Sequence, residues 1–382
     1  MAPPLDYMTL RLIWWALLGV LLIGFALTDG FDLGVAALLP FVGRSDAERR
    51  LTINTVGATW EGNQVWFILG GGAIFAAWPL VYAVSFSGFY PAMLLVLGLL
   101  ILRPVSFKYR SKRPSKAWRS AWDWALFASG IGPAVIFGVA VGNVLVGLPF
   151  SFDSDLRMHY AGGVLDLFGP FPLICGLLSA GMLITHGAAW LTLKAEKGPV
   201  RDRARAIGVG GAVLSILLFA AGYAFVAYGG LGFRLTSPAD PAGASNPLYS
   251  LTLAAPGAWL DNFHAHPIFW IAPFLGFLGA ALAGIGLRAG SEAAAFAGSS
   301  FAILGVIGTV GLSMFPFILP SSIDAHSSLT AWNASSSAST LFTMLVAVAV
   351  LLPIVLAYTA FVYRVMFGRT TLASVALDPD LY

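Results

Sequence analysis

The sequence has few charged residues and almost no cysteine. Asp, Glu, Lys and Arg make up only 10% of its 382 residues, against about 25% in soluble domains, so a soluble enzyme is excluded. The single cysteine, Cys175, excludes an intrachain disulfide and a CxxC redox or zinc motif. Disorder is excluded as well, because 58% of the residues are hydrophobic. This composition indicates a polytopic membrane protein.

Long apolar segments run through the whole chain. A membrane-spanning helix needs about 20 mostly apolar residues, and nine segments qualify, at approximately 9–41, 56–78, 80–102, 117–146, 168–193, 206–228, 267–287, 293–319 and 339–366. They are apolar on every face, which favours helices over barrel strands that alternate with period two. We therefore predict an all-α polytopic membrane protein with one membrane domain over 1–382. Nine helices would fit two four-helix bundles plus a peripheral helix.

The basic residues predict the orientation. With nine spans, all but three of the 21 Lys and Arg residues fall on one side, the exceptions being Arg11, Arg157 and Arg234. Lys and Arg accumulate on the cytoplasmic side, so the N-terminus is expected outside and the C-terminus in the cytoplasm. The predicted location is the cytoplasmic (inner) membrane of a prokaryote. Eight or ten spans would break this pattern.

Three acidic residues lie inside predicted spans. Asp29 and Asp32 share one helix face in the run TDGFDLG, and Glu61 lies in TWEGNQVW. Each costs about 2.5–3.5 kcal/mol at a helix centre, so these residues must face protein, water or a cation. The predicted topology places all three toward the cytoplasmic side. Arg103, at the end of the third span, and Asp123, at the start of the fourth, are expected at the same level.

Three interpretations of this cluster remain open. It could be a proton path, a static ion-pair network in which Arg103 neutralises one acid, or a group of carboxylates solvated near the interface. We favour the proton path, because carboxyl groups shielded by the bilayer can exchange protons. The partner of Arg103 is left open among Asp29, Asp32, Glu61 and Asp123.

The histidines and tryptophans offer no clear redox site. His186 is the one histidine inside a span, and we expect a hydrogen-bonded structural role for it. No two spans present facing histidines, so the chain is predicted to carry no catalytic residue, metal site or haem of its own. Trp60 and Trp66 flank Glu61; they are expected to pack in the core, although a quinone ring could stack there. No motif points to nucleic acid.

Several long blocks resemble subunit II of the cytochrome bd-type quinol oxidases. They include GFALTDGFDLGVAALLPFVGRSDAERR, TWEGNQVWFILGGGAIFAAWP, FSGFYPAMLLVLGLLILRPVSFKYRSK and, later, MFPFILPSS. The resemblance runs from RLIWWALLGVLLIGFA to VYRVMFGR, which is nearly the whole chain.

The resemblance implies a role in a respiratory complex. In such a complex a membrane quinol is oxidised and oxygen is reduced to water, with two haem b and one haem d in subunit I. Subunit II would complete the heterodimer and contribute a cytoplasmic proton path through Asp29 and Glu61, with Asp32, Arg103 and Asp123 as neighbours. Some relatives carry a structural quinone, and a small single-helix subunit can join. Relatives usually have Asp at the position of Glu61, a change that a water-linked relay should tolerate.

Two other functions remain possible from the sequence. A proton-coupled secondary transporter would use the same buried acids, but no paired, interrupted half-helices are visible in corresponding positions. A purely structural scaffold for the haem-bearing subunit is the other alternative. Neutral variants of Glu61 and Asp29 would separate a scaffold from a proton path.

Overall fold

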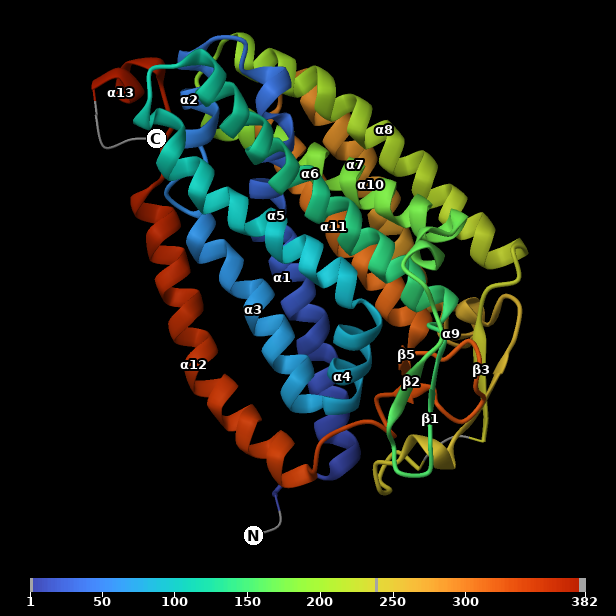
Figure 1. Cartoon of the computed structure of the whole chain (residues 1–382). Coiled ribbons are helices and arrows are strands. Elements are labelled where there is room, and N and C mark those ends of the chain that lie inside the picture. Colours follow the sequence, from blue (N-terminus) through green and yellow to red (C-terminus); the bar gives the residue numbers. More distant parts are fainter. Residues whose placement is uncertain (1–2, 238–239, 378–382) are drawn as a thin grey trace.

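The computed structural model describes residues 3–237 and 240–377, so the two ends of the predicted 1–382 domain lie outside the described residues. Long helices run side by side and form a bundle (Figure 1). They are α1 (Tyr7–Val42), α3 (Trp60–Ala77), α5 (Tyr90–Tyr109), α6 (Lys116–Val146), α7 (Pro170–Lys194), α8 (Pro199–Tyr228), α10 (Ile271–Ala289), α11 (Glu292–Met314) and α12 (Ala338–Val365). Shorter helices α2 (Asp46–Asn54), α4 (Pro79–Gly88), α9 (Asp261–Ala265) and α13 (Leu372–Leu377) lie between or after them.

Eight helical segments among the described residues are long and apolar enough to cross a membrane. The prediction of a polytopic, all-α membrane protein is confirmed. Helix α3, which covers most of the predicted second span, falls outside these eight because Glu61, Asn63 and Gln64 make its first turns polar. The count of nine spans therefore stays a prediction. The start of α1 and the end of α12 lie at opposite ends of the bundle (Figure 1), which agrees with an odd number of crossings.

The predicted span at 80–102 consists of two helices. Helix α4 ends at Gly88 and α5 begins at Tyr90. Proline stands in the first turn of each helix, where its missing N–H leaves no intrahelical bond unmade. The helical segment that is long and apolar enough to cross the membrane therefore extends from Tyr90 to Lys112, ten residues later than the sequence indicated.

The helices pack in two groups with one helix at the periphery. Helices α7, α8, α10 and α11 contact one another, while α1 contacts α3 and α6, and α5 packs on α6. Helix α1 also packs on α7 and so joins the groups. Helix α12 contacts only α1 and α3 substantially, and Leu341 is its one fully buried residue. The peripheral place of α12 agrees with the prediction of one outer helix. Because α6 packs on α7 more extensively than on α5, the division into two four-helix bundles stays a prediction.

Helices α1 and α7 approach unusually closely at two glycines. A Cβ atom on Gly34 would lie 2.0 Å from the carbonyl oxygen of Leu183, and one on Gly187 would lie 2.4 Å from the backbone of Gly34. No side chain fits at either position. Small residues that let helix backbones approach are typical of membrane bundles.

One end of the bundle carries short β-hairpins. Strand β1 (Phe150–Phe152) pairs with β2 (Met158–Tyr160), β3 (Phe233–Ser237) with β4 (Leu251–Ala254), and β5 (Phe317–Leu319) with β6 (Leu329–Thr330), all antiparallel. Buried Arg11 ties this end together by donating hydrogen bonds to Ser335 Oγ and to the carbonyls of Pro241 and Gly243. The opposite end, with α2, α13 and the α5–α6 connection, is called the basic end below.

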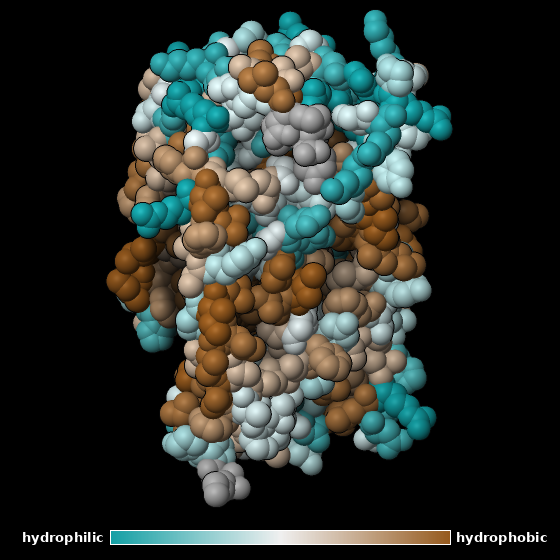
Figure 2. Space-filling model, turned by 90° about the vertical axis from the view of Figure 1, so that its left-hand side faces the viewer, coloured by the Kyte–Doolittle hydropathy of each residue, from teal (hydrophilic) through white to brown (hydrophobic). Residues whose placement is uncertain are grey.

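An apolar band covers the side of the bundle on which α12 lies. Figure 2 shows hydrophobic side chains gathered across the middle of this face, with hydrophilic ones mainly toward the basic end. Val350, Ile354 and Phe361 of α12 are among its exposed apolar residues. Such a surface requires lipid or another membrane protein against it.

Candidate functional site

Two buried carboxylates lie one turn apart on α1, toward the basic end. Asp29 and Asp32 are only 1% and 2% exposed. Asp29 accepts two hydrogen bonds from the guanidinium of Arg103 on α5, with Nη1 to Oδ1 at 2.5 Å and Nη2 to Oδ2 at 3.0 Å. Arg103 is itself buried. Of the four acids that the sequence left open as its partner, Arg103 therefore pairs with Asp29, in the bidentate geometry that guanidinium groups favour.

Asp32 is held from the other side, by α3 and α12. Asn63 Nδ2 donates to Asp32 Oδ2 at 2.8 Å, and the hydroxyl of Tyr363 donates to Asn63 Oδ1 at 2.7 Å. A hydrogen-bonded line thus runs from the peripheral helix α12 through α3 to α1. Both polar atoms of the Asn63 side chain are used in it.

Three buried polar atoms around these residues have no protein partner. Asp32 Oδ1, Arg103 Nε and Trp60 Nε1 form no hydrogen bond with any described residue. Nearly all buried polar groups in native proteins are paired, and ordered water is the usual partner when protein supplies none. The surroundings of Asp32 therefore have the chemistry of a hydrated polar site inside the bundle.

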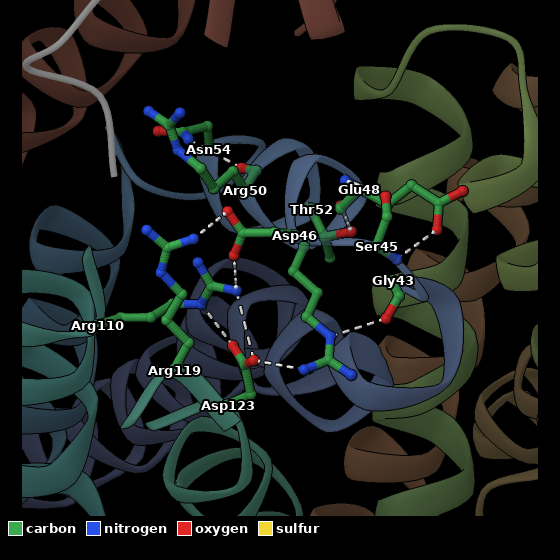
Figure 3. A network of polar contacts seen from close by, with 11 residues as sticks. Gly43, Ser45, Asp46, Glu48, Arg50, Thr52, Asn54, Arg110, Arg119 and Asp123 are labelled. Atoms are coloured by element: carbon green, nitrogen blue, oxygen red, sulfur yellow. Dashed lines mark hydrogen bonds and ion pairs between the residues drawn. The ribbon is translucent and has the colours of Figure 1, made fainter. Parts of the chain in front are cut away.

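Asp123 belongs to a separate cluster closer to the basic end (Figure 3). It is 1% exposed and accepts hydrogen bonds from Arg110 Nε and Arg49 Nη1, both at 2.6 Å. Asp46 then bridges Arg110 and Arg119, at 2.9 Å from each. We expected Asp123 to lie beside Arg103, but Asp123 pairs with Arg49 and Arg110 while Arg103 pairs with Asp29. The first turns of α6 lie against α2 instead, through the pairs of Asp123 with Arg49 and of Arg119 with Asp46.

Glu61 lies apart from the buried acids. It is exposed on the first turn of α3, and no hydrogen bond or ion pair joins it to another residue in the described part of the chain. Asn63 is two positions later, which turns it about 200° around the helix toward Asp32. The carboxyl group of Glu61 therefore lies on the outer surface of the chain, whereas the Asn63 side chain lies inside the bundle.

Trp60 and Trp66 are packed within the protein. The ring of Trp60 stacks on Phe107 at 5.1 Å between centroids with an interplanar angle of 8°. Trp66 lies against Gly24, where an added Cβ would come within 2.7 Å of its ring. Both are buried, which agrees with the expected role in the core. A quinone contact through either ring stays a prediction.

His186 is not available as a ligand to haem iron. Its Nδ1 lies 2.8 Å from Ser299 Oγ and its Nε2 lies 3.0 Å from the carbonyl oxygen of Leu27, so both ring nitrogens are engaged. Its ring also stacks on Phe296. In residues 3–237 and 240–377, no group of three or more His, Cys, Asp or Glu side chains is placed to hold a metal ion.

Sequence reasoning missed several partners in these networks. Asn63 was visible as a polar neighbour of Glu61, but its direction toward Asp32 depends on the phase of α3. Tyr363 carries no signal in the sequence beyond its place near the end of an apolar run. Arg49 and Arg110 lie in basic segments, where they were counted only as charges that set the orientation.

Comparison with known proteins assigns the family. A family model described as cytochrome bd terminal oxidase subunit II matches residues 10–366. The chain is 48% identical over 367 residues to cytochrome bd-I ubiquinol oxidase subunit 2 of Escherichia coli, covering 96% of this chain and 97% of that one. It is 47% identical over 365 residues to a probable cytochrome oxidase subunit 2 of Haemophilus influenzae, covering 96% of each.

A solved structure has the same fold. A chain of the bd oxidase from Geobacillus thermodenitrificans superposes with a TM-score of 0.67 at 16% identity, covering 94% of this chain and 100% of that chain. Since both the family match and the close relatives span nearly the whole sequence, the chain belongs to the cytochrome bd terminal oxidase subunit II family.

Proposed function

We propose that this chain is the non-haem subunit of a quinol:oxygen oxidoreductase, and that it supports the haem-bearing subunit I and supplies a cytoplasmic proton path for the reduction of oxygen to water. Its relatives are named as subunits of bd ubiquinol oxidases, which are multi-pass complexes of the bacterial inner membrane. Proton uptake from the inside would make the reaction electrogenic without a pump. Each charge moved across 100 mV stores about 2.3 kcal/mol.

The observation that carries the proposal is the buried, half-satisfied carboxylate of Asp32. Its Oδ2 is held by Asn63, while Oδ1 has no partner among the described residues. Asp29 is committed to Arg103 on both oxygens, so Asp32 is the carboxyl group left to exchange a proton. Water that satisfies Oδ1, Arg103 Nε and Trp60 Nε1 would form the hydrated segment of the path.

Glu61 would carry the path out of this chain. A carboxylate that faced hydrocarbon would cost about 2.5–3.5 kcal/mol, so its exposure on α3 is best explained by a polar partner surface or by water at the subunit interface. We place subunit I against this face. At the other end, Asp123 lies closer to the basic end between Arg49 and Arg110, and this cluster would mark the cytoplasmic entrance of the path.

The haems are expected in subunit I, as two haem b and one haem d, where they would supply the electron transfer that reduces oxygen. His186 of this chain has both ring nitrogens engaged, which supports that division of labour. In this chain, Asp32 and Glu61 would carry the protons. Arg103, Asn63 and Tyr363 would hold the buried carboxyl groups in position.

The proposal also includes a structural quinone or lipid and a small single-helix subunit. An apolar groove of about 440 Å³ lies between α1, α3 and α12, lined among others by Trp14, Leu69 and Leu352. It would suit the tail of a structural quinone or a lipid, and extraction of quinone from the purified complex tests this. A small single-helix subunit, if present, would co-purify with the complex.

A structural scaffold is the second candidate, and the full pairing of Asp29 and Asp123 favours it. Asp32→Asn separates the two functions, because the amide keeps the shape of the carboxylate but cannot carry the proton. A proton path predicts slower oxygen uptake with normal complex yield and unchanged haem spectra. A scaffold predicts unchanged oxygen uptake.

A further inference from the structure

A second polar site lies at the basic end, at the start of α8. A pocket of about 330 Å³ opens between the start of α8 and the turn that joins α10 to α11. Its charged lining residues are Lys197, Arg201, Asp202 and Arg205. None of these belongs to the acidic networks described above. The start of α8 lies beside the segment that follows α12, since Ala195 bridges to Thr370 and Lys194 Nζ donates to the carbonyl of Met366.

Arg201 provides the main evidence for a ligand in this pocket. It is 6% exposed, and its Nη2 pairs with Glu292 Oε1 at 2.6 Å. Its Nη1, by contrast, has no hydrogen-bond partner in the part of the chain that the structure describes. An unpartnered guanidinium nitrogen at such burial is costly. Arg201 lines the pocket, so an anionic oxygen bound there would lie next to its guanidinium and offset that cost.

The surroundings favour an anion. The pocket lies at the N-terminus of α8, a helix of 30 residues, where free N–H groups and the helix dipole attract negative charge. Lys197 is exposed at the rim, and Arg205 donates to the carbonyls of Leu287 and Arg288 from the α10 side. Three cations and one carboxylate, that of Asp202, line the pocket. Glu292, which pairs with Arg201, is shared with Arg369, so the site keeps an excess of positive charge.

We propose that this pocket binds a phosphate group, contacted by Arg201 and Lys197 at the N-terminus of α8. The planar guanidinium of Arg201 suits phosphate oxygens, and Lys197 adds a mobile point charge. The same chemistry could come from the headgroup of an anionic phospholipid in the inner leaflet or from a soluble phosphate compound. The experiment below distinguishes these sources.

The test uses the purified complex with its partner subunit. Wild-type protein, Arg201→Gln and Lys197→Gln are compared with Lys116→Gln, which removes an exposed lysine of the same end of the molecule outside the pocket. Inorganic phosphate is titrated while the unfolding temperature is followed. Native mass spectrometry counts lipids retained from nanodiscs of phosphatidylglycerol or of phosphatidylcholine.

We expect saturable binding that is about tenfold weaker in Lys197→Gln and Arg201→Gln and unchanged in Lys116→Gln. Retention of phosphatidylglycerol over phosphatidylcholine, displaced by phosphate, would identify a lipid headgroup. Phosphate binding without that retention would identify a soluble compound. The proposal is overturned if neither probe binds, or if the pocket variants bind as wild type does. Since Arg201→Gln also breaks the pair with Glu292, Lys197→Gln decides the matter if the former fails to assemble.

Discussion

The hydroxyl of Tyr363 donates a hydrogen bond of 2.7 Å to Oδ1 of Asn63, across 300 residues of sequence. This bond fixes which way the amide of Asn63 faces, because only its oxygen can accept from the hydroxyl. The amide nitrogen is thereby turned toward Asp32 Oδ2, 2.8 Å away. A residue of the peripheral helix thus sets the hydrogen bonding of a carboxylate in the centre of the bundle.

Tyr363→Phe should slow oxygen uptake about five- to tenfold, because a lost hydrogen bond of roughly 1–1.5 kcal/mol frees the Asn63 amide to turn. The ring is kept, so packing on Trp190 should persist. Oxygen consumption by the purified complex measures the effect, with haem spectra and complex yield as controls. Normal turnover would show that the line from Tyr363 to Asp32 is only structural.

Asp29→Asn should destabilise the complex by about 3–5 kcal/mol, since it leaves the guanidinium of Arg103 buried without its counter-charge. Thermal unfolding of the purified complex measures the loss. The double variant Asp29→Asn with Arg103→Met removes both charges and should recover most of the stability. If the single variant is as stable as wild type, the ion pair is not the buried contact described here.

Glu61→Gln should leave the free energy of unfolding within about 0.5 kcal/mol of wild type, because the side chain is exposed on this chain and unpaired among the described residues. Oxygen uptake should nevertheless fall, since the amide cannot carry a proton. Glu61→Asp keeps the carboxyl group and serves as the matched control. Equal rates for Glu61→Gln and Glu61→Asp would remove Glu61 from the path.

The ion pair between Glu48 and Arg203 predicts a pH dependence of stability. The hydrogen bond from Arg203, helped by the backbone N–H groups of Arg44 and Ser45, lowers the pKa of Glu48 below its usual 4.5. Because the folded pKa is depressed, the stabilisation is complete above pH 4.5 and is lost as the pH falls through the folded value. Glu48→Gln should therefore be less stable than wild type at pH 7, by about 1 kcal/mol. The difference should vanish in strong acid, as thermal unfolding across this range would show.

Gly34→Ala should prevent tight packing of α1 on α7, since the new methyl group would overlap the carbonyl oxygen of Leu183. We expect a low yield of assembled complex. Gly19→Ala, also on α1, has nothing within 4 Å of its added Cβ and should assemble normally. Equal yields for the two variants would contradict the close approach of α1 and α7.

The sequence predicted the fold class because hydrocarbon restricts the choice of structure to a few forms. Apolar length marked the spans, and the break between α4 and α5 was missed because hydropathy does not register where Pro79 and Pro91 restart a helix. One peripheral helix was expected from the helix count, but nothing in the sequence indicated that it would be α12.

The candidate site was predicted in part. Burial of Asp29, Asp32 and Arg103 follows from their place in apolar runs, and the structure brings these three together. The separation of Glu61 from them could not be predicted, because it depends on the rotation of α3 about its axis. The pairing of Asp123 with Arg110 depends on the tertiary approach of segments that one sequence does not reveal.

The loose attachment of α12 has a consequence for biogenesis. This helix buries only Leu341 fully against the rest of the chain, yet it carries the tyrosine that orients Asn63. We expect a newly inserted chain to hold α12 weakly until lipid or a partner covers its exposed face. If the proposed proton path is correct, unassembled copies would conduct protons poorly, and the membrane would be spared a leak.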